Sequence, residues 1–129
     1  MDNNTKLAYL ASRALIGALF FISGLGKVFA FSYVAGWMAS SGVPLASVLL
    51  AITIIIEVGG GLMLITGLQA RWSALAIALF TIPVTIVFHA FWSADAANFQ
   101  NQLTQFLKNL AIFGGLILVF QREKSQVSA

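Results

Sequence analysis

Residues 54–64 read Ile-Ile-Ile-Glu-Val-Gly-Gly-Gly-Leu-Met-Leu, and they place one carboxylate, Glu57, inside an apolar run. The run extends from about residue 45 to residue 67. An apolar stretch of roughly 20 residues is what an α-helix needs to cross the hydrocarbon of a bilayer. A carboxylate that is ionised and unpaired at that depth costs a few kcal/mol. The stretch therefore predicts a membrane-spanning helix in which Glu57 has a cationic partner.

The composition of the whole chain also indicates a membrane protein. Of the 129 residues, 60% are hydrophobic and 9% are charged, and the mean hydropathy is +0.94. A soluble domain of this size needs more polar surface than this chain can supply. The length suits one compact unit, so we expect a single transmembrane domain over residues 1–129.

Four apolar segments predict an all-α integral membrane protein that folds as a four-helix transmembrane bundle. They cover about residues 7–29, 45–67, 72–92 and 103–120. The second connection, residues 68–71, is short enough to make a tight hairpin, whereas residues 30–44 and 93–102 are expected to be longer loops. Pro83 is expected to kink the third span. Lys27 interrupts the apolar run just before a motif that resembles a signal-peptide cleavage site, so we expect no cleavage there.

Lysine and arginine positions predict the orientation, because cytoplasmic ends of membrane spans are enriched in these residues. The ends that would be cytoplasmic carry Lys6, Arg13, Arg71, Arg122 and Lys124, and the opposite ends carry Lys27 and Lys108. Both termini are therefore expected to be cytoplasmic.

Helical spacing collects the polar and small residues of each span on one face. These faces contain Arg13, Gly17, Gly24 and Lys27; Thr53, Glu57, Gly60 and Gly61; Thr81, Thr85, His89 and Trp92; and Lys108, Ala111, Ile112 and Gly115. In membranes such faces pack against other helices, so all four should point inward. Three cations are candidates for the partner of Glu57, and the sequence leaves Lys108, Arg13 and Lys27 open.

Each of these residues also has a structural interpretation. A buried ion pair can fix helix register without any chemistry. Lys27 could extend to the membrane surface, Arg13 could be an anchor at the cytoplasmic end, and His89 could be an interfacial residue beside Trp92. The aromatic residues of the segment 31–38 suit a membrane–water interface.

Several chemistries are excluded for this chain on its own. It has no cysteine and one histidine, so thiol redox chemistry, haem ligation by two histidines and a metal site built from its own residues are not expected. No flavin motif is evident. The net charge of +3 is too sparse for nucleic-acid binding.

Four motifs together resemble the DoxX family of small membrane proteins. Residues 13–27 read RALIGALFFISGLGK, residues 57–67 read EVGGGLMLITG and are followed by Arg71, residues 88–92 read FHAFW, and residues 106–118 read FLKNLAIFGGLIL. The resemblance implies a four-helix protein of the bacterial inner membrane. Some members of that family are linked to quinone-dependent oxidation, including subunits of a thiosulfate:quinone oxidoreductase, and others to oxidative stress or detoxification. Similar but more distant folds act as cargo receptors or receptor-assembly chaperones.

Three functional hypotheses follow. In the first, the chain is a quinone-reactive subunit of a membrane oxidoreductase system, with a polar site towards the periplasmic side. Glu57 and His89 would be the catalytic proton carriers, and the ligand-binding residues would be Lys27, Lys108, Asn109 and Arg13. A partner subunit or a homo-oligomer would accompany it in the bilayer. In the second, the chain is a non-enzymatic binding or assembly protein whose buried charges are structural. In the third, it is a small proton-coupled carrier.

Overall fold

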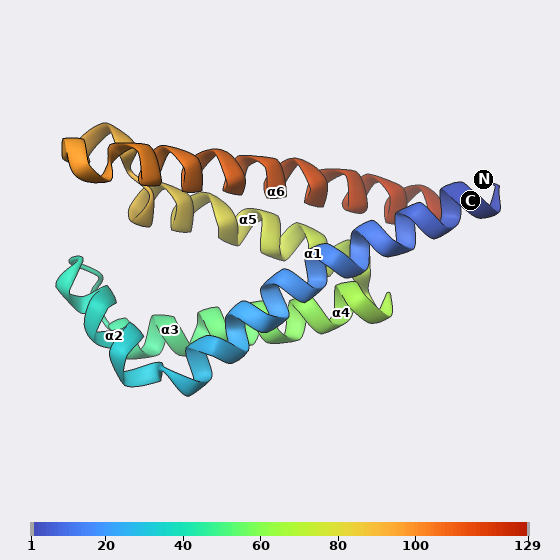
Figure 1. Ribbon diagram of the computed structural model, residues 1–129. Helices are drawn as coiled ribbons and strands as arrows, with labels where there is room; N and C mark the ends of the chain where they lie inside the picture. Colours follow the sequence, from blue (N-terminus) through green and yellow to red (C-terminus); the bar gives the residue numbers. More distant parts are fainter. Residues whose placement is uncertain (1, 129) are drawn as a thin grey trace. The chain divides into compact units, whose positions relative to one another are not determined.

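Helices make up nearly all of residues 2–128, the part of the chain that the computed structural model describes (Figure 1). No strand occurs within those residues, which confirms the all-α class. In chain order the elements are α1 (Asn3–Phe29), α2 (Phe31–Ser40), α3 (Ala46–Ile54), the π-helix η1 (Ile55–Gly59), α4 (Gly60–Thr66), α5 (Ala70–Phe88), the 3₁₀-helix η2 (Phe91–Ser93) and α6 (Ala96–Ser128). Because η1 joins α3 to α4 directly, these three elements form one span.

Four helical segments are long and apolar enough to cross a membrane, at the four places that the sequence predicts. They are Asn3–Phe29, Ala46–Thr66, Ala70–Ser93 and Ala96–Ser125. The first and fourth begin earlier than hydropathy indicates, because capping side chains set where a helix starts. Asp2 accepts a hydrogen bond from the Thr5 N–H at 2.7 Å, and Asp95 accepts one from the Asn98 N–H at 2.9 Å. The same Thr5 N–H holds the pKa of Asp2 below its usual range.

The connection between the first two spans was expected to be irregular, and most of it is the helix α2. Ala35 and Met38, spaced by one helical turn, are buried, so α2 is stabilised by packing along one side. It ends in a Schellman motif, in which Gly42 and Val43 donate to the carbonyls of Ala39 and Met38. Gly42 has a φ of +88°, a conformation that glycine adopts without strain. Packing along one side and a C-terminal cap, neither of which hydropathy registers, therefore account for the unexpected helix. Pro83 lies within α5, which continues to Phe88.

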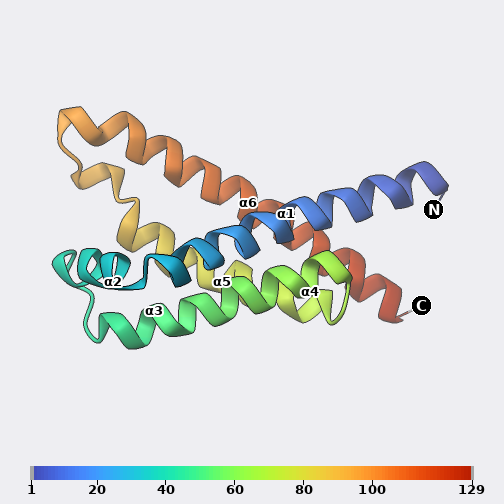
Figure 2. The same ribbon diagram turned by 60° about the horizontal axis from the view of Figure 1, so that its bottom comes forward.

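The chain divides into two compact units, Met1–Gln69 and Ala70–Ala129. We call them the N-terminal hairpin, which contains α1 to α4, and the C-terminal hairpin, which contains α5, η2 and α6. In each hairpin the two spans run antiparallel (Figures 1 and 2). The packing of the two hairpins into one bundle stays a prediction.

Two glycines let the spans of the N-terminal hairpin approach closely. A Cβ atom placed on Gly17 would lie 2.6 Å from the carbonyl oxygen of Gly61, and one placed on Gly61 would lie 2.6 Å from that of Gly17. Backbone atoms cannot yield to such a contact, so only glycine fits at both positions. This close approach confirms the expectation that these glycines serve helix packing.

Gly17→Ala should lower the free energy of unfolding by about 1–3 kcal/mol, because the added methyl group overlaps the backbone of α4. Gly26→Ala on the same helix is the matched control, since a Cβ atom there has no neighbour within 4 Å. Thermal unfolding in a mild detergent compares the two variants. Equal stability of both would contradict the close approach of α1 and α4.

Candidate functional site

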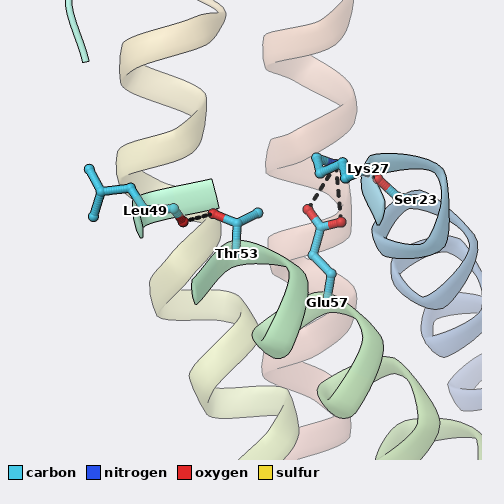
Figure 3. Close-up of polar contacts among 5 residues, drawn as sticks. All are labelled: Ser23, Lys27, Leu49, Thr53 and Glu57. Carbon is cyan, nitrogen blue, oxygen red and sulfur yellow. Dashed lines mark hydrogen bonds and ion pairs between the residues drawn. The ribbon is translucent and has the colours of Figure 1, made fainter. Parts of the chain in front are cut away.

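Glu57 pairs with Lys27 across the N-terminal hairpin (Figure 3). The ammonium Nζ of Lys27 lies 3.1 Å from both carboxylate oxygens and donates to the Ser23 hydroxyl at 2.8 Å. Helical side chains lean towards the N-terminus of their own helix. Lys27 lies near the C-terminal end of α1, so its side chain leans towards the middle of that helix. Glu57 lies in the middle of the second span, so its side chain leans towards α3. Because the spans are antiparallel, the two side chains lean towards each other. Of the three cations that the sequence left open, the hairpin thus brings Lys27 to Glu57.

The π-helix η1 is centred on Glu57. The opposing backbone at Gly24 comes so close that a Cβ atom there would lie 3.0 Å from the Glu57 Cβ and 2.7 Å from a methyl group of Val58. Just before η1, the Thr53 hydroxyl donates a hydrogen bond to the Leu49 carbonyl at 2.9 Å (Figure 3). Single π-turns within α-helices are frequent at functional sites. No feature of the sequence signalled this one.

The Lys27 ammonium has three N–H donors, and three acceptor atoms surround it. The side chains of Lys27 and Glu57 are 27% and 7% exposed, so most of the surface of the pair is buried. A ligand could take an N–H from Lys27 only by displacing Ser23 or one oxygen of Glu57. The geometry is that of a closed ion pair, which aligns α1 with η1. The Lys27 ammonium turns to Ser23 and Glu57, and its depth relative to the membrane surface stays a prediction.

Arg13 binds the end of α4. Its Nε donates to the Leu64 carbonyl at 2.8 Å, and its guanidinium covers Gly67, where the chain turns with a φ of +86°. The last carbonyls of a helix lack partners within that helix, and a cation there also opposes the negative end of the helix dipole. Leu64 lies two turns beyond Glu57, about 10 Å along the axis. Arg13 therefore caps α4.

A second group of polar residues lies within the C-terminal hairpin. Thr81 donates its hydroxyl hydrogen to the Ile77 carbonyl at 2.8 Å, and Thr85 donates to the Thr81 carbonyl at 2.7 Å. Asn109 Nδ2, on α6, donates to the Thr85 hydroxyl at 3.0 Å. Because the Thr85 hydrogen is already committed, Asn109 must present its amino group rather than its carbonyl oxygen to Thr85. The second amide N–H and the carbonyl oxygen of Asn109 have no partner within the described C-terminal hairpin.

A half-open pocket of about 230 Å³, which we call the cavity, lies beside this amide at the surface of the C-terminal hairpin. Its lining consists of Thr81, Ile82, Thr85, Ile86, Phe106, Asn109, Leu110 and Phe113. An apolar cavity of about 150 Å³ can bind benzene, so this one has room for a substituted six-membered ring. The cavity thus combines apolar walls with one amide.

His89 lies one turn beyond Thr85, and its Nδ1 is 2.9 Å from Gln102 Oε1. Phe91 and Trp92 in η2 each make an edge contact with Phe106, at ring separations of 5.1 and 5.9 Å. Since Phe106 also lines the cavity, these rings connect its wall to the η2 end of the hairpin. Gln102 and Phe106 were absent from the residues that the sequence indicated, because their side chains alone suggest no chemistry.

The side chain of Lys108 projects from a different side of α6 than that of its neighbour Asn109, since adjacent residues of a helix are about 100° apart around its axis. It is exposed and does not line the cavity. Within the described part of the C-terminal hairpin it has no hydrogen bond or ion pair. A role for Lys108 in ligand binding stays a prediction.

The sequence of the chain matches the model of the DoxX family over residues 8–90. The chain belongs to the DoxX family. It is similar to the inner membrane protein YqjF of Escherichia coli (strain K12), with 36% identity over 119 residues that cover 92% of this chain and 86% of the relative. It is also similar to the inner membrane protein YphA of the same organism, with 24% identity over 110 residues that cover 85% and 79%. No solved structure matches it.

Family membership and the four apolar spans together identify a multi-pass inner-membrane protein. The match to the DoxX model includes the Lys27–Glu57 pair and His89, and it ends before Asn109. The family is thus shown independently of the α6 wall of the cavity.

Glu57→Gln should destabilise the protein by about 3 kcal/mol, because it leaves the Lys27 ammonium partly buried without a counter-charge. The double variant Lys27→Met/Glu57→Leu should recover most of that loss, since apolar residues of similar volume often replace buried ion pairs without cost. Unfolding of Lys27→Met, Glu57→Leu and the double variant in detergent measures the coupling energy. Additive effects of the two positions would show that the pair does not join α1 to η1.

Proposed function

We propose that this chain is a quinone-reactive subunit of a membrane oxidoreductase system, with the quinone ring held in the cavity between α5 and α6. The observation that supports this most is the cavity itself. It has the volume of a ring site, Phe106 and Phe113 in its walls, and the partly unpaired amide of Asn109 at its side. Apolar pockets with a few convergent polar groups are the usual form of small-molecule sites.

The amide of Asn109 suits both redox states of such a ligand. Its second N–H would donate to a ring carbonyl, and its own carbonyl oxygen would accept from the hydroxyl of the reduced form. Thr85 fixes the orientation of the amide, because Thr85 can only accept from it. A bound quinone would supply the two-electron chemistry, and the protein would supply binding and orientation.

Protons would pass through His89, which lies near the η2 end of the hairpin. With Nδ1 donating to Gln102, the lone pair of the imidazole lies on Nε2, which is then the proton acceptor. Glu57 would be a second proton carrier, and its exchange would require Lys27 to move. The sequence has no cysteine, so the electrons would come from a partner protein or from a small reductant in the periplasm.

A non-enzymatic binding or assembly protein is the second candidate. It is favoured by the closed geometry of the Lys27–Glu57 pair and by the capping role of Arg13, both of which need no ligand. On this hypothesis α2, with Tyr33 79% exposed, would be the surface that contacts a partner.

Leu110→Trp should weaken quinone binding at least tenfold, because the indole would fill the cavity that Leu110 lines. Leu118→Trp is the matched control on the same helix, since Leu118 is 72% exposed and lies outside the cavity. Titration of ubiquinone and menaquinone into protein in nanodiscs measures the affinity. Asn109→Leu should also weaken binding by roughly tenfold, the equivalent of one lost hydrogen bond.

Quinone binding by the wild-type protein decides between the quinone-reactive subunit and the binding or assembly protein. Saturable binding that Leu110→Trp removes and Leu118→Trp leaves intact supports the cavity as the ring site. Absence of saturable binding to the folded wild-type protein would overturn the quinone proposal and favour the binding or assembly protein.

A further inference from the structure

We propose that Arg71 binds the phosphate group of a membrane phospholipid at the end of the C-terminal hairpin where α5 begins. The phosphate site contains none of the residues that line the cavity of Asn109, although Ile82 and Ile86, farther along the same side of α5, do line it. The inference does not depend on quinone chemistry. It rests on the stacking of the Arg71 guanidinium, on its lack of hydrogen-bond acceptors and on the apolar surface that continues from it.

Two aromatic rings hold the guanidinium. Its central carbon lies 4.4 Å from the centre of the Trp72 ring and 5.5 Å from that of Phe120 on α6. The two rings touch edge to face, with centres 6.4 Å apart. A guanidinium over an aromatic face is attracted to the ring, while its N–H groups remain in its own plane. The rings thus fix its position and leave its donors for another molecule.

No acceptor for those donors lies within the described part of the C-terminal hairpin. Arg71 forms no hydrogen bond or ion pair there, and its Nε is buried without a partner. A donor without an acceptor is destabilising, and more so in a charged group. The Arg71 Nε is out of reach of another molecule, but an anion with two oxygens beside the outer edge of the guanidinium would accept from its two terminal nitrogens. Phosphate oxygens have that geometry.

The position of Arg71 indicates a lipid as the source of the phosphate. Arg71 lies at the first turn of a segment able to span the membrane, where the headgroup region would be, and Trp72 is 53% exposed as is usual at such an interface. Farther along α5, Leu79, Ile82 and Ile86 are exposed at helical spacings that place them on the same side as Trp72. An acyl chain that descends from a phosphate at Arg71 would lie against these side chains.

The test compares lipid retention by the full-length protein in native mass spectrometry after delipidation and addition of defined lipids. The probes are phosphatidylglycerol and a diacylglycerol with the same acyl chains, which lacks the phosphate. Arg71→Gln should reduce phosphatidylglycerol retention roughly tenfold, the equivalent of one charge-assisted hydrogen bond. Lys124→Gln is the matched control, because it removes one exposed cation from the same end of the hairpin.

Arg71→Lys keeps the charge but loses the planar pair of donors, so it should retain phosphatidylglycerol less well than the wild type. It also keeps the test valid if Arg71→Gln fails to fold. The proposal is overturned if Arg71→Lys retains the lipid fully, if Arg71→Gln and Lys124→Gln lose it equally, or if the diacylglycerol is retained as well as phosphatidylglycerol. Displacement of the lipid by excess inorganic phosphate would reassign the site to a free anion.

Discussion

The ion pair between Lys27 and Glu57 is the contact on which the N-terminal hairpin depends. In hydrocarbon neither charge is tolerable alone, so the two side chains must meet, and their meeting fixes how α1 lies along η1. Gly24 permits the approach, because a side chain there would strike Glu57 and Val58. The π-turn at residues 55–59 sits at this point of closest contact. A charge requirement thus determines the register of two helices.

In the C-terminal hairpin, polar side chains in the span are satisfied by hydrogen bonds. There the hydroxyl groups of Thr81 and Thr85 each donate to a carbonyl of their own helix, four residues earlier. This arrangement satisfies the hydroxyl hydrogens within α5 and leaves an oxygen lone pair of Thr85 for Asn109. An amide held by one of its N–H groups keeps further capacity for hydrogen bonding. The Asn109 amide thus keeps hydrogen-bonding groups that are free within its hairpin, whereas the three N–H donors of Lys27 are all taken.

The arginines show how one residue type serves two purposes. The Arg13 Nε donates to the Leu64 carbonyl in the last turn of α4, where a cation opposes the helix dipole. Arg71 lies on aromatic rings and has no acceptor in its own hairpin. The two arginines count equally when orientation is predicted from the lysines and arginines at the ends of membrane spans. Their neighbours, rather than their charge, distinguish a structural cap from a site open to an anion.

The sequence by itself determined the all-α class, the four spans and the need for a partner to Glu57, because hydropathy and the cost of a lone charge are properties of the chain. The resemblance to the DoxX family likewise rested on residues alone. Helix starts and α2 escaped prediction, since they depend on caps and on the packing of Ala35 and Met38, which hydropathy does not register. Only the tertiary structure of the N-terminal hairpin brought Lys27, rather than Arg13, to Glu57, because helical spacing gives each residue a face but not the neighbour that the face meets. The cavity beside Asn109 likewise arises from the way α5 packs on α6, and no single segment of the sequence contains it.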